Sequence, residues 1–230
     1  MVRTERVDVG GLTLAVRVWP SSDGTVSPPL VLLHGTGMTA RDWDAVGPAL
    51  AVGREVRAVD LRGHGESNRP GTYSIALMAQ DVVALLDLAH EPQVDLVGHS
   101  LGGLVALRVA AARPERVRRL VLEDVGLPRP RTPAPPARPE GDIYFDWDVV
   151  EQVRPEVDDP APDWPDVVAG LAMPVLVVAG GPASHVPQDG IADLVAAARD
   201  GRCVTVDAGH LVHATEPERF LEAVEDFLSA

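Results

Sequence analysis

A Gly-x-Ser-x-Gly sequence between an apolar run and a helical run constrains this chain more than any other feature. Residues 98–102 read Gly-His-Ser-Leu-Gly; the apolar run 94–97 precedes them, and a run rich in alanine and leucine follows. A strand, a tight turn and a helix in this order form a nucleophile elbow, which exposes its serine at the edge of a sheet. Gly98 and Gly102 have no Cβ, so the two backbones can approach closely. The sequence therefore predicts Ser100 as a nucleophile beside the N-terminal amides of a helix.

Predicted strands alternate with predicted helices along the rest of the chain. Short apolar runs predict strands at 30–33, 56–59, 94–97, 117–123, 174–179 and 202–206, and an antiparallel hairpin opens the chain over 7–19. Helical patterns separate these runs, including one predicted over 39–50. We therefore expect an α/β fold with a mostly parallel sheet of about eight strands and helices on both faces.

Residues 127–172 interrupt this alternation. The stretch 127–139 contains six prolines, which excludes a helix there. We predict that 127–172 is a short lid that passes over the sheet edge, inserted into a core formed by 1–126 and 173–230. A long surface loop is the alternative.

An aromatic cluster lies within this predicted lid. Tyr144, Phe145 and Trp147 stand close together in a chain with only 4% aromatic residues. A solvated loop rarely carries so many large apolar side chains. We therefore predict that these three residues contact the substrate.

A serine is a weak nucleophile until a base removes its proton, so a base is required. Of the seven histidines, His210 directly follows the last predicted strand, in Ala-Gly-His, and is predicted as that base. His34 and His64 lie in glycine-rich turns and are expected to hold those turns by hydrogen bonds. His185 and His213 are candidate neighbours of the site, with His185 predicted to contact the substrate.

An acyl-transfer site also needs donors for a developing oxyanion. The Leu101 amide directly follows the serine, and the glycine-rich loop after the strand 30–33 offers the Thr36 amide. Because both donors are backbone amides, the side chains at these two positions say little for or against the predicted oxyanion site.

Four motifs in this order resemble those of the α/β-hydrolase superfamily. They are His34-Gly35-Thr36-Gly37, Asp60-x-Arg62-Gly63-His64-Gly65-x-Ser67, Gly98-His99-Ser100-x-Gly102-Gly103 and Gly209-His210. The match looks closest to the single-domain esterase, lactonase and haloperoxidase-like branch, and it covers nearly the whole chain outside 127–172. The resemblance implies an α/β-hydrolase fold with Ser100 as nucleophile, His210 as base, and Thr36 and Leu101 as oxyanion donors.

The acid of the triad is where this sequence departs from the family pattern. Family members commonly carry it in the loop that corresponds to 180–187, but this loop has no carboxylate, and His185 stands about where an aspartate is expected. Some members carry the acid one strand earlier, where this chain has Glu123 and Asp124. Since strand residues alternate in direction, only one of these two can face His210. Asp124 is predicted as the acid and Glu123 is the alternative; a turn-capping role for Asp124 stays open.

Composition narrows the ligands and partners. The net charge is −14 and no basic stripe is present, which argues against nucleic acid as a partner. All 20 basic residues are arginine, so lysine Schiff-base chemistry is excluded. The absence of a metal-ligand motif and of a dinucleotide fingerprint predicts no metal and no cofactor. Cys203, the single cysteine, lies in a predicted strand, where a buried structural thiol is expected.

No apolar run approaches the length of a membrane span, and the first residues lack the apolar core of a signal peptide. We therefore expect a cytoplasmic protein that acts on a small molecule and on no membrane. The sequence does not specify an oligomeric state.

The leading hypothesis is a serine hydrolase that cleaves a small apolar ester, lactone or thioester by acyl transfer. Because the nucleophile is a serine, the aspartyl-ester chemistry that the resemblance associates with haloalkane dehalogenases and epoxide hydrolases is disfavoured. The alternatives are a C–C bond hydrolase or a biosynthetic tailoring enzyme on the same fold, and a non-catalytic receptor that keeps the pocket.

Overall fold

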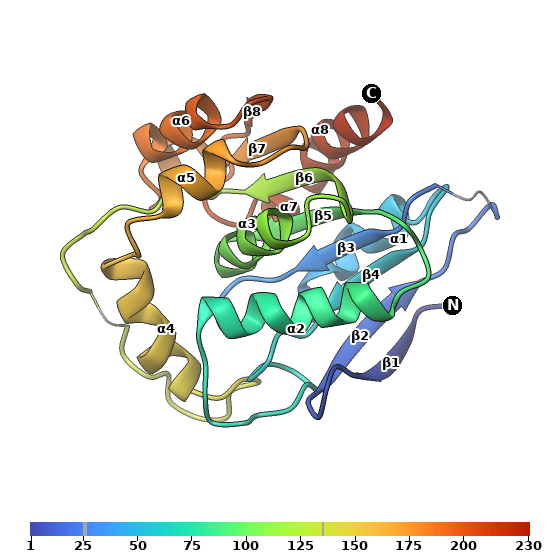
Figure 1. Cartoon of the computed structure of the whole chain (residues 1–230), viewed down its shortest axis with the longest axis horizontal. Coiled ribbons are helices and arrows are strands. Elements are labelled where there is room, and N and C mark those ends of the chain that lie inside the picture. The colour runs from blue at the N-terminus through green and yellow to red at the C-terminus, as the bar shows by residue number, and fades with distance from the viewer. Residues whose placement is uncertain (25–26, 135) are drawn as a thin grey trace.

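The computed structural model describes residues 1–24, 27–134 and 136–230, so residues 25 and 26 of the loop before the third strand and residue 135 of the predicted lid lie outside the described residues. One eight-stranded sheet runs through the molecule in the order β1-β2-β4-β3-β5-β6-β7-β8 (Figure 1). The strands are β1 (Arg3–Asp8), β2 (Thr13–Trp19), β3 (Leu30–Leu33), β4 (Val56–Val59), β5 (Val94–His99), β6 (Val117–Glu123), β7 (Val175–Ala179) and β8 (Gly201–Thr205). β2 is antiparallel to both of its neighbours, and all other pairings are parallel. The predicted α/β fold class is confirmed.

Helices cover both faces of this sheet, as Figure 1 shows. One face carries α2 (Ile75–Leu88), α3 (Leu101–Ala112), α5 (Trp164–Ala169) and α6 (Gln188–Ala197). The other carries η1 (Ala40–Ala45), α1 (Gly47–Leu50), α7 (Val212–Thr215) and α8 (Pro217–Ser229). A short turn, η2 (Gly181–Ala183), follows β7. Because apolar layers lie on both sides, every residue of the central strands β3, β5 and β7 is buried.

The helix predicted over 39–50 is divided into η1 and α1. Thr39 caps η1 through a capping box. Its side chain accepts a hydrogen bond from the Asp42 amide, and the Asp42 carboxylate accepts one from the Thr39 amide. Pro48 cannot donate a backbone hydrogen bond, and its ring would clash with the carbonyl four residues earlier in a continuous helix. The chain therefore makes a tight 3-10 turn and restarts at Gly47.

β8 differs from the other predicted strands because it is the last strand of the sheet. Its residues 202–205 are exposed, and Cys203 is among them. The expectation of a buried thiol is wrong, since an edge strand has neighbours on one side only.

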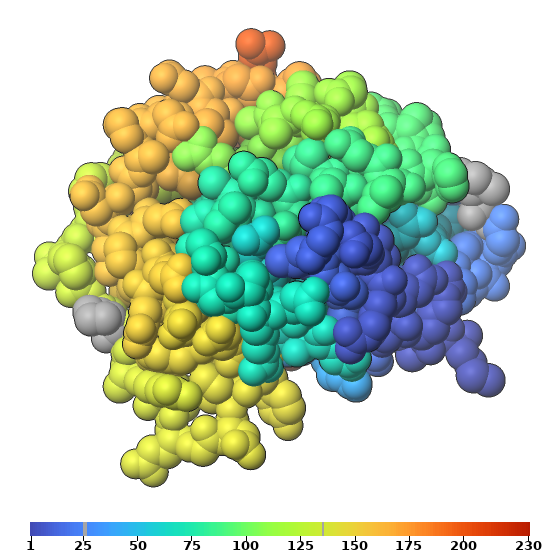
Figure 2. Space-filling view, turned by 60° about the horizontal axis from the view of Figure 1, so that its bottom comes forward, coloured from blue at the N-terminus to red at the C-terminus, as the bar shows by residue number. Residues whose placement is uncertain are grey.

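The segment between β6 and β7 contains one element that the sequence analysis did not predict. Its proline-rich part is irregular as expected, but α4 (Asp148–Asp158) follows it. Pro155 lies inside α4 and obscures the helical pattern, whereas Val149, Val150 and Val153 are buried on one side of it at helical spacing. Figure 1 shows α4 apart from the helices that cover the sheet, beyond the carboxyl ends of the parallel strands. In Figure 2 the yellow part of this segment protrudes from the body of the molecule.

Candidate active site

Ser100 occupies a strained turn between β5 and α3. Its backbone has φ 51° and ψ −117°, and Ser100 and Asp124 are the non-glycine residues with positive φ in the described part of the chain. Such conformations cost about 1–3 kcal/mol each and persist where the surrounding structure enforces them. A Cβ on Gly98 would overlap the carbonyl of Gly102, and one on Gly102 would overlap the carbonyl of Leu33. The close backbone approach predicted from these two glycines is therefore present.

A cavity of about 800 Å³ opens in front of this turn. Ser100, Leu101, Thr36 and His210 all line it, although they come from separate parts of the chain. Because β3, β5 and β6 are parallel neighbours, their carboxyl ends lie together at this one edge of the sheet. The structure thus gathers the predicted nucleophile, base and amide donors around one space.

Asp124 lies against His210. Its Oδ2 accepts a hydrogen bond from His210 Nδ1 at 2.6 Å and a short one from the Ser184 hydroxyl, while its Oδ1 accepts from the Gly180 amide at 2.9 Å. Burial alone would raise the pKa of Asp124, but the hydrogen bonds from His210, Ser184 and Gly180 lower it below its ordinary value. The carboxylate is therefore ionised and fixes the orientation of the His210 ring.

Glu123, the alternative acid, binds a different histidine. Its carboxylate accepts from the backbone amide of His213 at 2.9 Å and from His213 Nδ1 at 2.8 Å. Both groups are buried, and the His213 ring packs against Trp43 with centroids 4.3 Å apart. Burial would raise the pKa of Glu123, but His99 and His213 lower it. Two adjacent carboxylates thus hold two histidines in the same short segment.

Among the residues that the structure describes, neither predicted amide donor has an acceptor. Leu101 is the first residue of α3, and the first amides of a helix have no intrahelical acceptor. Thr36 is exposed to the cavity, and no group in the described ranges accepts its amide hydrogen.

The neighbouring turns are held by neutral histidines. His34 Nε2 accepts from the Leu61 amide at 3.1 Å, and His64 Nε2 accepts from the Gly37 amide at 3.2 Å. Burial lowers the pKa of His34 to about 4 and that of His64 to about 3, so both rings stay uncharged acceptors at neutral pH. Both bonds agree with the expected role of these residues.

Further histidines surround His210. The ring of His185 lines the cavity and lies 4.2 Å from the His210 ring, measured between centroids. His99 donates from Nε2 to the main-chain carbonyl of His210 at 2.9 Å.

The aromatic cluster divides between the cavity and the solvent. Phe145 and Trp147 line the cavity, and Phe145 stacks on His64 with centroids 5.6 Å apart. The Tyr144 side chain is 79% exposed and does not line the cavity, so its predicted contact with substrate is not supported by its position. Phe145, the next residue, is buried and pairs with His64 through an isolated β-bridge, so it is held on the inner side.

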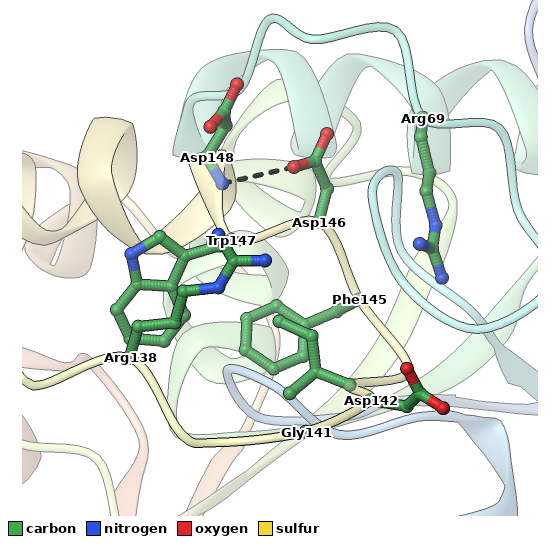
Figure 3. A pocket seen from close by; sticks show the side chains of 9 residues that line it. Arg69, Arg138, Gly141, Asp142, Phe145, Asp146, Trp147 and Asp148 are labelled. Atoms are coloured by element: carbon green, nitrogen blue, oxygen red, sulfur yellow. Dashed lines mark hydrogen bonds between the residues drawn. The ribbon is translucent and has the colours of Figure 1, made fainter.

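A second, polar hollow lies on the outer side of this segment (Figure 3). Figure 3 shows Arg69 and Asp142 on one side of it, Arg138 and Trp147 on the other, and Phe145 in the middle. Since these two aromatic residues also line the larger cavity, they form the wall between the two hollows.

Most of the apolar wall of the cavity comes from a helix that the sequence pattern did not predict. Val149, Val150, Val153 and Val157 of α4 line the cavity. Their helical spacing was the available signal. They give this part of the cavity lining a hydrocarbon surface.

Within the described ranges, no three or more His, Cys, Asp or Glu side chains are placed to share a metal ion. The same ranges contain no helix with the length and apolar character needed to cross a bilayer.

Part of the chain is similar in sequence to known hydrolases. The chain is 44% identical over 104 residues to the pimeloyl-(acyl-carrier protein) methyl ester esterase of Klebsiella pneumoniae, an alignment that covers 45% of this chain and 39% of the esterase. It is 46% identical over 99 residues to a 2-hydroxymuconate semialdehyde hydrolase of a Pseudomonas species, with 41% of this chain and 35% of that protein covered. The chain therefore matches well under half the length of these curated relatives.

Similarity to a solved structure extends over the whole chain. A hydrolase from Pseudomonas aeruginosa PA01 superposes with a TM-score of 0.84 at 26% identity, covering 99% of both chains. A family model described as the alpha/beta hydrolase fold matches residues 28–167, which is more than half of the chain. The eight-stranded sheet, the strained serine turn and this match together show that the chain belongs to the alpha/beta hydrolase fold family.

Proposed function

We propose that this protein is a serine hydrolase that cleaves an ester, lactone or thioester with a largely apolar acyl part. The observation that carries the proposal is the hydrogen bond between Asp124 and His210 Nδ1 in a cavity that Ser100 also lines. With Nδ1 bound, Nε2 is the nitrogen available to Ser100, and no group in the described part of the chain occupies it.

In the proposed mechanism, His210 Nε2 removes the proton from the Ser100 hydroxyl as its oxygen attacks the substrate carbonyl. The amides of Leu101 and Thr36 donate to the oxyanion that forms. His210 then protonates the leaving group, and water, activated by the same ring, releases the acyl group from Ser100. Asp124 stays ionised and stabilises the imidazolium in each step.

Several features make this electrostatic arrangement effective. Asp124 is buried and accepts hydrogen bonds from Gly180 and Ser184 as well as from His210, so its carboxylate keeps one orientation. The amide donors are part of the backbone and need no reorganisation when charge develops.

The apolar wall supports the choice of substrate. The valines of α4 line the cavity together with Leu104, Phe145 and Trp147. A cavity of about 800 Å³ is within the range that holds a small organic molecule. We propose that the 127–172 segment acts as a lid over this space, inserted in a core formed by 1–126 and 173–230.

A C–C bond hydrolase is the second candidate. One specific observation favours it, the 46% identity over 99 residues to a 2-hydroxymuconate semialdehyde hydrolase. The same residues would then act on a ketone in place of an ester.

Labelling with an active-site fluorophosphonate tests the proposal. We expect rapid modification of Ser100, lost in Ser100→Ala and strongly slowed in His210→Ala, together with turnover of 4-nitrophenyl esters. An absence of both labelling and turnover in the folded protein, with ligand binding intact, would favour a receptor. Turnover of a vinylogous diketone with no turnover of esters would favour the C–C hydrolase.

A further inference from the structure

Arg131 and Arg154 share one carboxylate. Arg131 Nε donates to Asp158 Oδ1 at 2.7 Å, and Arg154 Nε donates to the same oxygen at 2.8 Å. Asp158 is buried, with 4% of its surface exposed. Two guanidinium groups therefore face a single negative charge, and one positive charge is left uncompensated.

The terminal nitrogens of both guanidinium groups are also unused. Within the described ranges, neither Arg131 nor Arg154 donates a hydrogen bond from an Nη atom. Their side chains are 44% and 28% exposed, so these nitrogens reach open space. A guanidinium with free Nη groups suits a planar anion, which it can bind through two parallel hydrogen bonds.

This free charge lies at the candidate active site. Both arginines line the cavity that contains Ser100 and His210, although Arg131 comes from the proline-rich stretch and Arg154 from α4. Burial, His210 and these two arginines all lower the pKa of His185, whose ring lies against His210. The two arginines therefore place positive charge close to His185, the neighbour of the candidate base.

The other charged side chains that line the cavity have partners of their own. Arg129 forms ion pairs with Asp189 and Asp193, and Asp124 is bound by His210. Arg131 and Arg154 differ from Arg129, because two guanidinium groups share the single carboxylate of Asp158.

We infer that Arg131 and Arg154 form a binding site for a carboxylate carried by the substrate, remote from the carbonyl that Ser100 attacks. A carboxylate fits better than a phosphate monoester, because one excess positive charge matches one negative charge and a phosphate carries nearly two. The apolar wall then holds the hydrocarbon between the two ends. This inference rests on the proposed function and narrows its substrate class to esters or lactones with a carboxylate.

Paired substrates test this inference. On the acyl side, 4-nitrophenyl monoesters of dicarboxylic acids of increasing length are compared with 4-nitrophenyl esters of unbranched fatty acids that have equal numbers of carbons. On the alcohol side, 4-carboxyphenyl butyrate is compared with 4-methylphenyl butyrate. We expect kcat/KM to favour the carboxylated member by about tenfold or more in one of the two series, as for a hydrogen-bonded charge pair. The series that shows the preference identifies the end of the substrate that carries the carboxylate.

Single variants identify the residues. Arg131→Gln and Arg154→Gln are each expected to remove most of this preference, measured as the ratio of the two kcat/KM values. Arg108→Gln removes the same charge from α3, where Arg108 pairs with Asp163 outside the cavity, and is expected to leave the ratio unchanged. Two independent arginine variants keep the test decisive if one of them folds poorly.

A binding measurement separates this inference from the proposed function. In Ser100→Ala, calorimetry should detect tighter binding of the carboxylated ester than of the neutral one, whether or not the parent protein turns esters over. Equal binding and equal turnover of the paired compounds would overturn the carboxylate site and leave the hydrolase proposal intact. Tighter binding of the carboxylated ester without any turnover would support the site and count against the hydrolase.

Discussion

The imidazole of His99 donates a hydrogen bond from Nε2 to the main-chain carbonyl of His210, 2.9 Å away. His99 immediately precedes Ser100, so this bond ties the serine turn to the backbone of the candidate base. A Cβ on Gly35 would come within 2.8 Å of His99 Nδ1, so the same ring also packs against the loop that carries Thr36. One buried side chain therefore contacts all three parts of the site.

His99→Ala is expected to lower kcat by about 10-fold to 100-fold with a smaller change in KM, because small displacements of catalytic groups reduce rates strongly. Steady-state kinetics on a 4-nitrophenyl ester measures both constants. His90→Ala, which changes an exposed histidine at the end of α2, is the matched control. An unchanged kcat in folded His99→Ala would show that the bond does not position His210.

Asp124→Asn is expected to reduce kcat by about 10⁴-fold, because the amide no longer favours the tautomer and charge that the His210 ring needs. Glu123→Gln keeps the hydrogen-bonding shape beside His213 but removes a buried charge. We expect it to lower the free energy of unfolding by about 1.5–3 kcal/mol and to change kcat far less. Turnover and urea denaturation of both variants check these expectations. A large loss of kcat in Glu123→Gln, with kcat retained in Asp124→Asn, would identify Glu123 as the acid.

Trp147→Ala is expected to change the preference among acyl chain lengths, since Trp147 is part of the wall between the cavity and the outer hollow. A panel of 4-nitrophenyl esters from short to long acyl chains measures this, alongside the melting temperature. Tyr144→Ala is the control, because the Tyr144 side chain is exposed. A lower melting temperature of Trp147→Ala with unchanged chain-length selectivity would mean that Trp147 packs in the hydrophobic core and does not contact the substrate.

The protein is expected to lose stability as the pH falls below about 6.5. Burial lowers the pKa values of His34 and His99 to about 4 and that of His64 to about 3, from an ordinary value of 6.5. Above pH 6.5 these rings are neutral in both states; below it the unfolded chain takes up protons that the folded chain does not. As the pH falls below 6.5, each ring therefore reduces the free energy of unfolding by up to about 1.4 kcal/mol per pH unit. This loss ends when the pH reaches the folded-state pKa of that ring.

Urea denaturation between about pH 7 and pH 5 measures this slope. His64→Gln, which keeps an acceptor for the Gly37 amide, is expected to make the slope shallower. A slope that is flat in the parent protein, or equally steep in His64→Gln, would contradict the assignment.

The fold class and the serine turn follow from the order of amino acids alone. Strands buried on both faces require unbroken apolar runs, and such runs are visible at 30–33 and 94–97 without any coordinates. The two glycines around Ser100 follow from the same local geometry, since only a residue without a Cβ fits the close approach of strand and helix. These features depend on neighbours in the chain, so pattern and spacing reveal them.

Which carboxylate lies against His210 depends on contacts between distant parts of the chain. Glu123 and Asp124 are adjacent, and strand alternation shows that they diverge without showing which one faces the base. The positive φ of 50° at Asp124 turns its side chain toward His210 and leaves Glu123 for the buried His213. That conformation depends on groups far along the chain, Gly180 and Ser184 among them.

The same holds for the segment after β6. The outward position of Tyr144, the inward position of Phe145 and the shared carboxylate of Arg131 and Arg154 depend on where α4 packs. Contacts between distant segments decide these positions, and no local pattern of residues encodes them.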